Sequence, residues 1–144
     1  MLEEACRDIP YFCVSDMEIR REGNTYSSDT LAILLEENPD TDYYFIIGGD
    51  SLLAIDTWHD PAYLLANCCI IAAAREETAL DIYEAKAEKL RDRFGARISF
   101  MDIPRLDLSS TEIRKRVRGG LSVKYLVPGG TEKYIKEHGL YLNG

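Results

Sequence analysis

The segment from Ser109 to Arg114 has the residue types that point most directly to chemistry. Ser109 and Glu112 have the spacing of a capping box, so a helix is expected to begin here. Its start would bring free backbone N–H groups, the hydroxyls of Ser110 and Thr111, and the positive end of the helix dipole to one point. Arg114 follows one turn later. This pattern is typical of a phosphate site.

The alternative for the same segment is a capped surface helix with solvated charges. Four basic residues crowd the helix, and they point at several helical angles, so they cannot all face one ligand. This interpretation, a charge that faces solvent, suits Lys115 and Arg116 better than it suits Arg114.

A second candidate site is Gly48-Gly49-Asp50, which follows the apolar run 43–47. That run predicts a parallel strand buried on both faces and ending at a ligand-facing loop. Open parallel sheets bind ligands beyond the carboxyl ends of their strands. The glycines would let a ligand approach the backbone, and Asp50 could accept hydrogen bonds from a ribose. An ordinary tight turn explains the same three residues.

Two further features leave alternatives open. Trp58 is the only tryptophan, and it is either a core anchor or a platform for a flat aromatic ring. Ser27 and Ser28 follow Tyr26 before an apolar helical pattern, and they either cap that helix or help its N–H groups hold a carboxylate. His59 and His138 lack metal-ligand spacing, so no structural zinc is expected.

The elements that must position these residues alternate between helix and strand, which predicts an α/β fold with a mainly parallel sheet and flanking helices. A single domain over residues 1–144 is expected. The predicted helices cover 1–9, about 28–38, a short segment from Asp60-Pro61 through Leu65, the Tyr83–Phe94 pattern closed by Gly95, 109–118 stopped by Gly119-Gly120, and 131–138. The predicted strands are a buried 11–14 continued or bent through 19, then 43–47, 68–73 and 98–101.

Composition limits the classes of partner. A net charge of −8 and a pI near 4.8 argue against non-specific binding to nucleic acid or an anionic membrane. No apolar stretch predicts a membrane span or a signal peptide. The cysteines lack Cys-x-x-Cys spacing and are expected to be reduced core thiols in a cytoplasmic protein; they are Cys6, Cys13, Cys68 and Cys69.

The order of motifs resembles that of bacterial nicotinate-nucleotide adenylyltransferase, and the resemblance extends over essentially the whole chain. The Ser-Ser-Thr-x-Ile-Arg element and the closing Tyr-Leu-Val-Pro element are specific together, whereas Gly-Gly-Asp alone would not be. The matching segments are 26–31, 45–50, Trp58, Arg75, 108–114, 125–128, 134–135 and 139–141.

The resemblance implies a Rossmann-like nucleotidyltransferase fold and transfer of AMP from ATP to nicotinate mononucleotide with Mg²⁺, giving nicotinate adenine dinucleotide and pyrophosphate. It assigns the adenosine of ATP to Gly48 and Asp50, and it places Arg75 near the nucleotide. The phosphates would contact Ser110, Thr111 and Arg114. The acceptor would use Trp58 for the pyridine ring and Ser27 with Ser28 for the carboxylate, with His59 where the family often has Tyr.

The chain also departs from this family pattern. The family's opening glycine-rich loop and His-x-Gly-His element have no counterpart, so no catalytic residue is assigned, and an N-terminally truncated fold is expected. Little adenylyl transfer and marginal stability or self-association would follow. A non-catalytic nucleotide-binding module is the alternative. A third possibility, pantetheine phosphate as the acceptor, is opposed by Trp58 and the Ser27-Ser28 pair.

Overall fold

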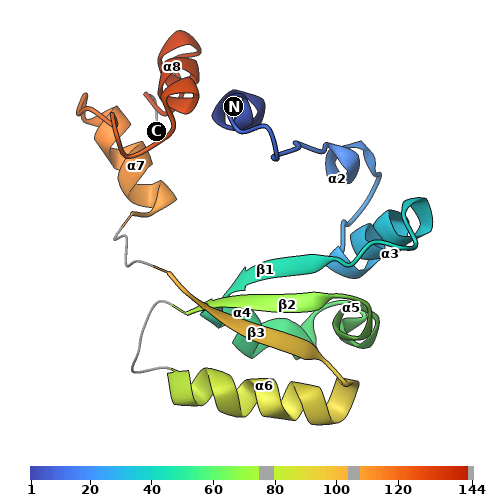
Figure 1. Ribbon diagram of the computed structural model, residues 1–144. Coiled ribbons are helices and arrows are strands. Elements are labelled where there is room, and N and C mark those ends of the chain that lie inside the picture. Colours follow the sequence, from blue (N-terminus) through green and yellow to red (C-terminus); the bar gives the residue numbers. More distant parts are fainter. Residues whose placement is uncertain (75–79, 104–107, 143–144) are drawn as a thin grey trace. The chain divides into compact units, whose positions relative to one another are not determined.

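The computed structural model describes residues 1–74, 80–103 and 108–142 (Figure 1). It divides into two compact units, which we describe one at a time. One unit combines Met1–Asp16 with Leu106–Gly144, and the other is Met17–Arg105. We call them the discontinuous unit and the sheet unit. That they work as a single domain over residues 1–144 stays a prediction.

The sheet unit is built around three described strands, which pair in parallel in the order β1-β2-β3. This confirms the predicted α/β class with a parallel sheet. Its elements are α2 (Met17–Arg20), α3 (Ser27–Glu37), β1 (Tyr44–Gly48), α4 (Gly49–Ala54), the 3₁₀ helix η1 (Ile55–Thr57), α5 (Pro61–Asn67), β2 (Cys69–Ala74), α6 (Leu80–Phe94) and β3 (Arg97–Asp102).

Local sequence signals set the boundaries of several of these elements. Asp60 caps α5, because its carboxylate accepts a hydrogen bond from the Tyr63 N–H at 3.1 Å. Gly95 ends α6 with a φ of +64°, a conformation that glycine adopts without steric cost. Asn38 follows the last turn of α3. The predicted helices at these three places are confirmed, and so are the strands at β1, β2 and β3.

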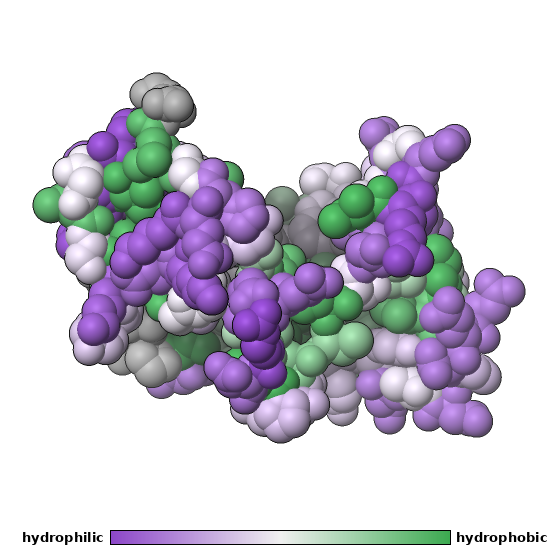
Figure 2. Space-filling model, turned by 90° about the horizontal axis from the view of Figure 1, so that it is seen from above, coloured by the Kyte–Doolittle hydropathy of each residue, from purple (hydrophilic) through white to green (hydrophobic). Residues whose placement is uncertain are grey.

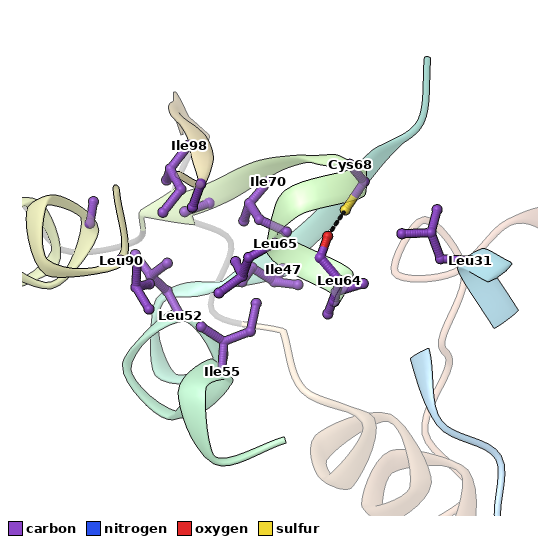
Figure 3. Close-up of a cluster of buried hydrophobic side chains, with 13 residues drawn as sticks. Leu31, Ile47, Leu52, Ile55, Leu64, Leu65, Cys68, Ile70, Leu90 and Ile98 are labelled. Atoms are coloured by element: carbon purple, nitrogen blue, oxygen red, sulfur yellow. Dashed lines mark hydrogen bonds between the residues drawn. The ribbon is translucent and has the colours of Figure 1, made fainter. Parts of the chain in front are cut away.

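One face of the sheet forms the core of this unit (Figure 3). Ile47, Ile70 and Ile98 come from the three strands and pack against apolar side chains of the neighbouring helices. Leu52 of α4, Ile55 of η1, Leu64 and Leu65 of α5 and Leu90 of α6 are each no more than 2% exposed. In Figure 1, α6 lies below the sheet. Burial of these side chains supplies the main favourable free energy of folding for the unit.

The prediction that β1 is buried on both faces is wrong. Tyr44 and Ile46, which alternate with the packed Phe45 and Ile47, are 61% and 64% exposed. Alternate residues of a strand point to opposite faces, so β1 is packed on one face only. A continuous run of apolar residues therefore does not by itself show that both faces of a strand are buried.

The discontinuous unit contains α1 (Leu2–Cys6), α7 (Ser110–Arg118) and α8 (Gly129–Glu137). Helix α1 packs against α8. Gly130 permits this approach, because a Cβ at that position would collide with the backbone carbonyl of Glu4. Gly120, with a φ of +67°, stops α7, and Gly139, with a φ of +59°, follows α8. Both stops agree with the sequence prediction.

Three predictions about the first part of the chain are wrong. The described residues 11–14 form no strand, and Tyr11 and Phe12 are 82% and 56% exposed. Residues 17–20 form the helix α2 instead of continuing a strand, and α1 ends at Cys6 rather than near Ile9. A segment rich in aromatic and β-branched residues becomes a strand only where a neighbouring strand pairs with it.

The cysteines are only partly as expected. Cys68 is buried, but Cys13 is exposed, and Cys6 and Cys69 are half-buried. All four are free thiols. Burial raises the pKa of the Cys68 thiol to about 11, and the neighbouring Cys69 adds to the shift. Cys68 therefore behaves as a small apolar core residue that stays protonated.

The described surface is largely hydrophilic in the view of Figure 2, with patches of apolar side chains between the polar ones. Among the described helices, none combines the length and the apolar character that crossing a bilayer requires.

Candidate functional site

The N-terminus of α3 forms the first part of the candidate site in the sheet unit. The helix begins at Ser27, and Tyr26 is its N-cap, so neither serine is the capping residue. No side chain among the described residues caps this end. By position, the backbone N–H groups of the first turn have no partner within the helix. These N–H groups could donate hydrogen bonds to a carboxylate.

Charged side chains lie close to this helix end, one guanidinium among two carboxylates. Asp29 lies in the first turn, where its carboxylate would repel an anionic ligand. Arg21 lies on the other side of this carboxylate, donating to Asp29 Oδ2 at 2.8 Å and to Thr30 Oγ1 at 3.1 Å. Thr30 Oγ1 also donates to Glu18 Oε1 at 2.7 Å. The Arg21 guanidinium therefore offsets the Asp29 charge and ties α2 to the first turn of α3.

Ser28 has an unusual environment within that turn. It is 3% exposed, and its Oγ has no hydrogen-bond partner among the described residues. A buried hydroxyl without a partner costs about 1–3 kcal/mol of desolvation, so such groups in a folded protein call for an explanation. A ligand that accepts a hydrogen bond from Ser28 would supply the missing partner.

Two aromatic residues that follow η1 approach this helix end. The His59 imidazole stacks on the Tyr26 ring, with centroids 4.0 Å apart and planes inclined by 22°. Trp58 packs edge-to-face against Phe45 of β1 at 6.1 Å and 81°. Trp58 is half-buried against the core cluster, so it is an anchor that keeps part of its indole accessible. Both interpretations of Trp58 from sequence therefore remain compatible with its position.

A cavity of about 130 Å³ lies beside these groups, between α3, β1 and α5. Its lining includes Ser27 and Thr30 of α3 and Phe45 of β1, whose ring also contacts Trp58; Glu18 of α2 lies at it as well. The cavity is otherwise lined by apolar side chains; the remaining lining residues are Leu31, Leu34, Tyr43, Tyr44, Leu64 and Cys68.

The Gly48-Gly49-Asp50 segment is a helix start rather than the predicted loop. Gly48 ends β1 and is the N-cap of α4, so the strand passes directly into the helix. Gly49 is required by packing, because a Cβ there would collide with the Tyr83 ring of α6. A Cβ at Gly48 would meet no described atom within 4 Å. Of the two glycines, only Gly48 leaves space for a ligand, and the exposed Asp50 follows it at the same strand end.

The short segment that bears Trp58 is fixed to α6 by an ion pair. Lys86 Nζ donates to Asp56 Oδ1 at 2.6 Å, and the side chains are 17% and 29% exposed. This hydrogen bond holds the pKa of Asp56 below its ordinary value of 3.8. Within the segment, Thr57 Oγ1 donates to the Ala54 carbonyl at 2.7 Å. These bonds restrict the position of Trp58 and His59.

The predicted phosphate site lies in the discontinuous unit, at the start of α7. Ser109 is the N-cap, and its Oγ accepts from the Glu112 N–H at 3.1 Å, which confirms the predicted cap. Ser110, Thr111 and Arg114 are exposed. Within the part of the chain that the structure describes, Arg114 has no ion-pair partner. The first turn of α7 thus presents two hydroxyls, backbone donors and one unpaired guanidinium.

Neighbouring basic residues of α7 differ from Arg114. Arg116 Nε donates to the Ser122 carbonyl at 3.0 Å, so this side chain holds the turn after the helix. Lys115 is exposed. Arg75, the remaining residue expected near the nucleotide, lies outside the described residues. Four residues around the site were not predicted from the sequence: Tyr26, Arg21, Lys86 and Asp56. Only Tyr26 had a signal, since it directly precedes the two serines.

The fold and the site together define a class. A parallel sheet with flanking helices, an uncapped helix start, an open glycine after a strand and a stacked aromatic pair are together typical of a Rossmann-like nucleotide-binding architecture. Residues 1–116 match the family model described as cytidylyltransferase-like.

Relatives among known proteins narrow that class. The chain is 42% identical over 142 residues to a probable nicotinate-nucleotide adenylyltransferase of Lachnoclostridium phytofermentans, covering 99% of this chain and 71% of the relative. It is 38% identical to the protein of the same description from Syntrophotalea carbinolica, covering 98% of this chain and 71% of that relative. The chain therefore belongs to the cytidylyltransferase-like family and, within it, to the nicotinate-nucleotide adenylyltransferases.

A solved structure agrees on the fold. The Plasmodium falciparum nicotinic acid mononucleotide adenylyltransferase complexed with APC superposes with a TM-score of 0.64 at 24% identity. The match covers 83% of this chain and 60% of that one. The same enzyme complexed with NaAD gives a TM-score of 0.63 and covers 58% of its chain. The predicted Rossmann-like nucleotidyltransferase fold is confirmed.

Proposed function

We propose that this protein transfers AMP from ATP to nicotinate mononucleotide, forming nicotinate adenine dinucleotide and pyrophosphate in NAD biosynthesis. The observation that supports this most directly is the group at the start of α3. There, the unpartnered hydroxyl of Ser28 and an uncapped helix end lie next to the Tyr26–His59 stack. A ligand that combines a carboxylate with a flat ring would satisfy both features.

The acceptor's nicotinate carboxylate is assigned to Ser27, Ser28 and the N–H groups of the first turn of α3. Hydrogen bonds to a charged acceptor are about twice as strong as neutral ones, so a buried hydroxyl donor is well matched to a carboxylate. Trp58 and His59 would contact the pyridine ring by offset or edge packing. A carboxamide in place of the carboxylate has no negative charge to interact with the helix dipole, so the arrangement favours the acid over the amide.

The residues proposed for ATP fall into two groups. Gly48 and Asp50 would contact the adenosine, since the open backbone of Gly48 admits close approach. Ser110, Thr111 and Arg114 would contact the phosphates at the start of α7. Arg75 completes the proposed set.

The reaction needs positioning and charge neutralisation more than covalent help. The acceptor phosphate oxygen attacks the α-phosphorus of ATP, the P–O bond to the β-phosphate breaks, and pyrophosphate leaves with the electron pair. Mg²⁺ enters with ATP as part of the substrate and neutralises charge on its phosphates. Arg114 and the α7 dipole would stabilise the negative charge of the leaving group.

The proposed partners are these small molecules, and we propose the cytoplasm as the compartment. The four free thiols support a reducing environment. The net charge of −8 supports small-molecule substrates over nucleic acid.

The test combines binding and turnover. Calorimetric titration of the purified protein with ATP and with nicotinate mononucleotide should show binding of each. When both are present with Mg²⁺, chromatography should detect only slow formation of the dinucleotide product, because no residue of this chain takes the place of the family's His-x-Gly-His element. Arg114→Ala should weaken ATP binding about tenfold or more, because it removes a charge-assisted contact.

Lys115→Ala is the matched control for this variant. It removes one positive charge from the next position of α7 and should leave the affinity for ATP within about twofold, a change worth less than 0.5 kcal/mol. Binding without product would favour a non-catalytic nucleotide-binding module. Absence of binding for both ligands would contradict the proposal.

A further inference from the structure

Tyr26 connects two parts of the sheet unit that are distant in sequence. Its backbone is the N-cap of α3, and its carbonyl accepts a hydrogen bond from the Thr30 N–H at 3.1 Å. Its ring stacks on His59, which follows Trp58 directly. The main chain of Tyr26 thus lies at the helix end proposed to bind the nicotinate carboxylate. Its ring contacts His59, which is proposed to contact the pyridine ring.

The Tyr26 ring is held from a second direction. Asn24 Nδ2 donates to the Tyr26 hydroxyl at 3.1 Å. Arg21 and Glu18 hold the Thr30 hydroxyl, and the Thr30 N–H donates to the Tyr26 carbonyl. Tyr26 is 37% exposed, so its ring adds little to the core and is oriented mainly by these polar contacts and the stack.

We infer that Tyr26 is a positioning residue for the acceptor, because its ring holds His59, and with it Trp58, at a fixed distance from the N-terminus of α3. This inference rests on the proposed function and adds a residue to it. One face of the His59 ring is covered by Tyr26, so the stack supports His59 from behind. An aromatic pair of this geometry is worth more than the apolar area it covers.

The physical reason for such a support is preorganisation. A short segment after a 3₁₀ helix would otherwise sample several orientations, and a ligand would have to order it upon binding. The Lys86–Asp56 ion pair fixes the start of this segment, and the Tyr26 stack fixes its end. The hydrogen-bond donors for the carboxylate and the rings that contact the pyridine are then held at a fixed distance from each other before the ligand binds. This favours acceptors in which the carboxylate and the ring have the same separation.

The first measurement tests the stack without any ligand. The protein has only two histidines, His59 and His138, so their ring protons are easily assigned by NMR. His138 stacks on Tyr134 at 3.9 Å and 13°, which provides an internal reference of the same kind. Tyr26→Leu should move the His59 ring signals downfield, by loss of ring-current shielding, and leave those of His138 in place. Tyr134→Leu should do the reverse.

The second measurement tests the consequence for binding. Trp58 is the only tryptophan, so its fluorescence reports nicotinate mononucleotide binding directly. Tyr26→Leu should weaken this binding about fivefold to tenfold, as expected for loss of a supporting aromatic pair. Tyr26→Phe keeps the ring and should restore an affinity within about twofold of the original. Tyr134→Leu should leave the affinity unchanged.

The outcomes separate the inference from the proposed function. Unchanged His59 signals in Tyr26→Leu would overturn the stack, and full affinity in that folded variant would overturn the positioning role while the proposed function stands. Failure of the unmodified protein to bind the acceptor would overturn the proposed function itself and the inference with it. Equal losses in Tyr26→Phe and Tyr26→Leu would also contradict the inference, because the ring would then be irrelevant.

Discussion

At the scale of single residues, the burial of the Ser28 hydroxyl indicates what this side chain does. The side chain is nearly fully buried and its hydroxyl has no partner among the described residues. Evolution of a stable fold alone would favour Ala at such a place, because Ala has no hydroxyl to desolvate. The serine at this position therefore indicates that its hydroxyl gains a hydrogen-bond partner when a ligand binds.

The variant Ser28→Ala tests this reasoning. We expect the free energy of unfolding to stay the same or to rise by up to about 1 kcal/mol, since an unpaired buried group is removed. The affinity for nicotinate mononucleotide should fall about fivefold, because the carboxylate loses one donor. Chemical denaturation and calorimetry measure the two quantities. Ser99→Ala, at an exposed position of β3, should change neither. A loss of stability with unchanged affinity would assign Ser28 a purely structural role.

The sequence predicted most of the candidate residues at this scale but not their partners. Ser109 was recognisable as a cap because its partner, Glu112, is three positions away. The Tyr26–His59 and Lys86–Asp56 pairs were not predictable, because each joins residues about thirty positions apart through the tertiary fold. Local patterns report local contacts.

At the scale of elements, the segment between β1 and α5 is held by one ion pair to α6. Lys86→Met should destabilise the protein by about 1 kcal/mol at pH 7, because it removes a charge-assisted hydrogen bond in a partly buried setting. Lys89→Met, an exposed lysine of the same helix, should have little effect.

The pH dependence of this destabilisation gives a second check. The pKa of Asp56 is lowered in the folded protein by its bond to Lys86, so the unfolded chain binds the proton more readily. The stabilisation is then fully present above the ordinary pKa of 3.8 and is lost as the pH falls through the lower folded value. Urea unfolding at a series of pH values should show the difference between Lys86→Met and the original protein shrinking below about pH 4. A constant difference would exclude Asp56 as the partner.

Gly49 sets the distance between α4 and α6. Gly49→Ala should cost about 1–3 kcal/mol, because the added methyl group would collide with the Tyr83 ring. Combining it with Tyr83→Ala should remove part of that penalty relative to Tyr83→Ala alone, which a double-mutant cycle by denaturation would measure. Gly48→Ala is the control, since a Cβ there meets no described atom. Equal costs for the two glycine variants would contradict the packing explanation.

Helices and strands were predicted well where residues close in sequence determine the structure. They were predicted poorly where the structure depends on contacts with distant segments. Helices α5 and α7 were recognisable from Asp60-Pro61 and from Ser109 with Glu112. The segment 11–14 has the composition of a strand, yet strand formation depends on a partner that the sequence does not reveal. Gly48-Gly49-Asp50 was predicted as a loop because glycines usually mark turns, whereas here Gly49 permits a helix to pack closely.

At the scale of the whole molecule, β1 exposes a face that most strands of a parallel sheet bury. Tyr44 and Ile46 are both more than half exposed. Among the described strands, β1 pairs with β2 alone, so one edge has backbone groups outside the described ladder. Exposed apolar faces and strand edges favour association between copies. Sedimentation velocity should therefore show concentration-dependent self-association.

The variant Ile46→Thr should weaken this association, because it replaces an exposed apolar side chain by a polar one that still suits a strand. Ile19→Thr is the control, since Ile19 is 86% exposed but lies on α2. A protein that sediments as a monomer at every concentration would contradict the expectation. Equal effects of both variants would point to general surface hydrophobicity instead of the β1 face.

The close approach of Gly130 to Glu4 has a consequence for how the chain folds during synthesis. Helix α1 leaves the ribosome more than 120 residues before its partner α8, since Cys6 ends α1 and Gly129 begins α8. The sheet unit lies between them and is built from strands that pair with their neighbours along the chain, so it can form while translation continues. Until α8 is made, α1 lacks the helix that it packs against, and its half-buried Ala5 and Cys6 are more exposed. Nascent chains stalled before residue 129 should therefore bind chaperones through α1, and that binding should disappear once α8 has emerged.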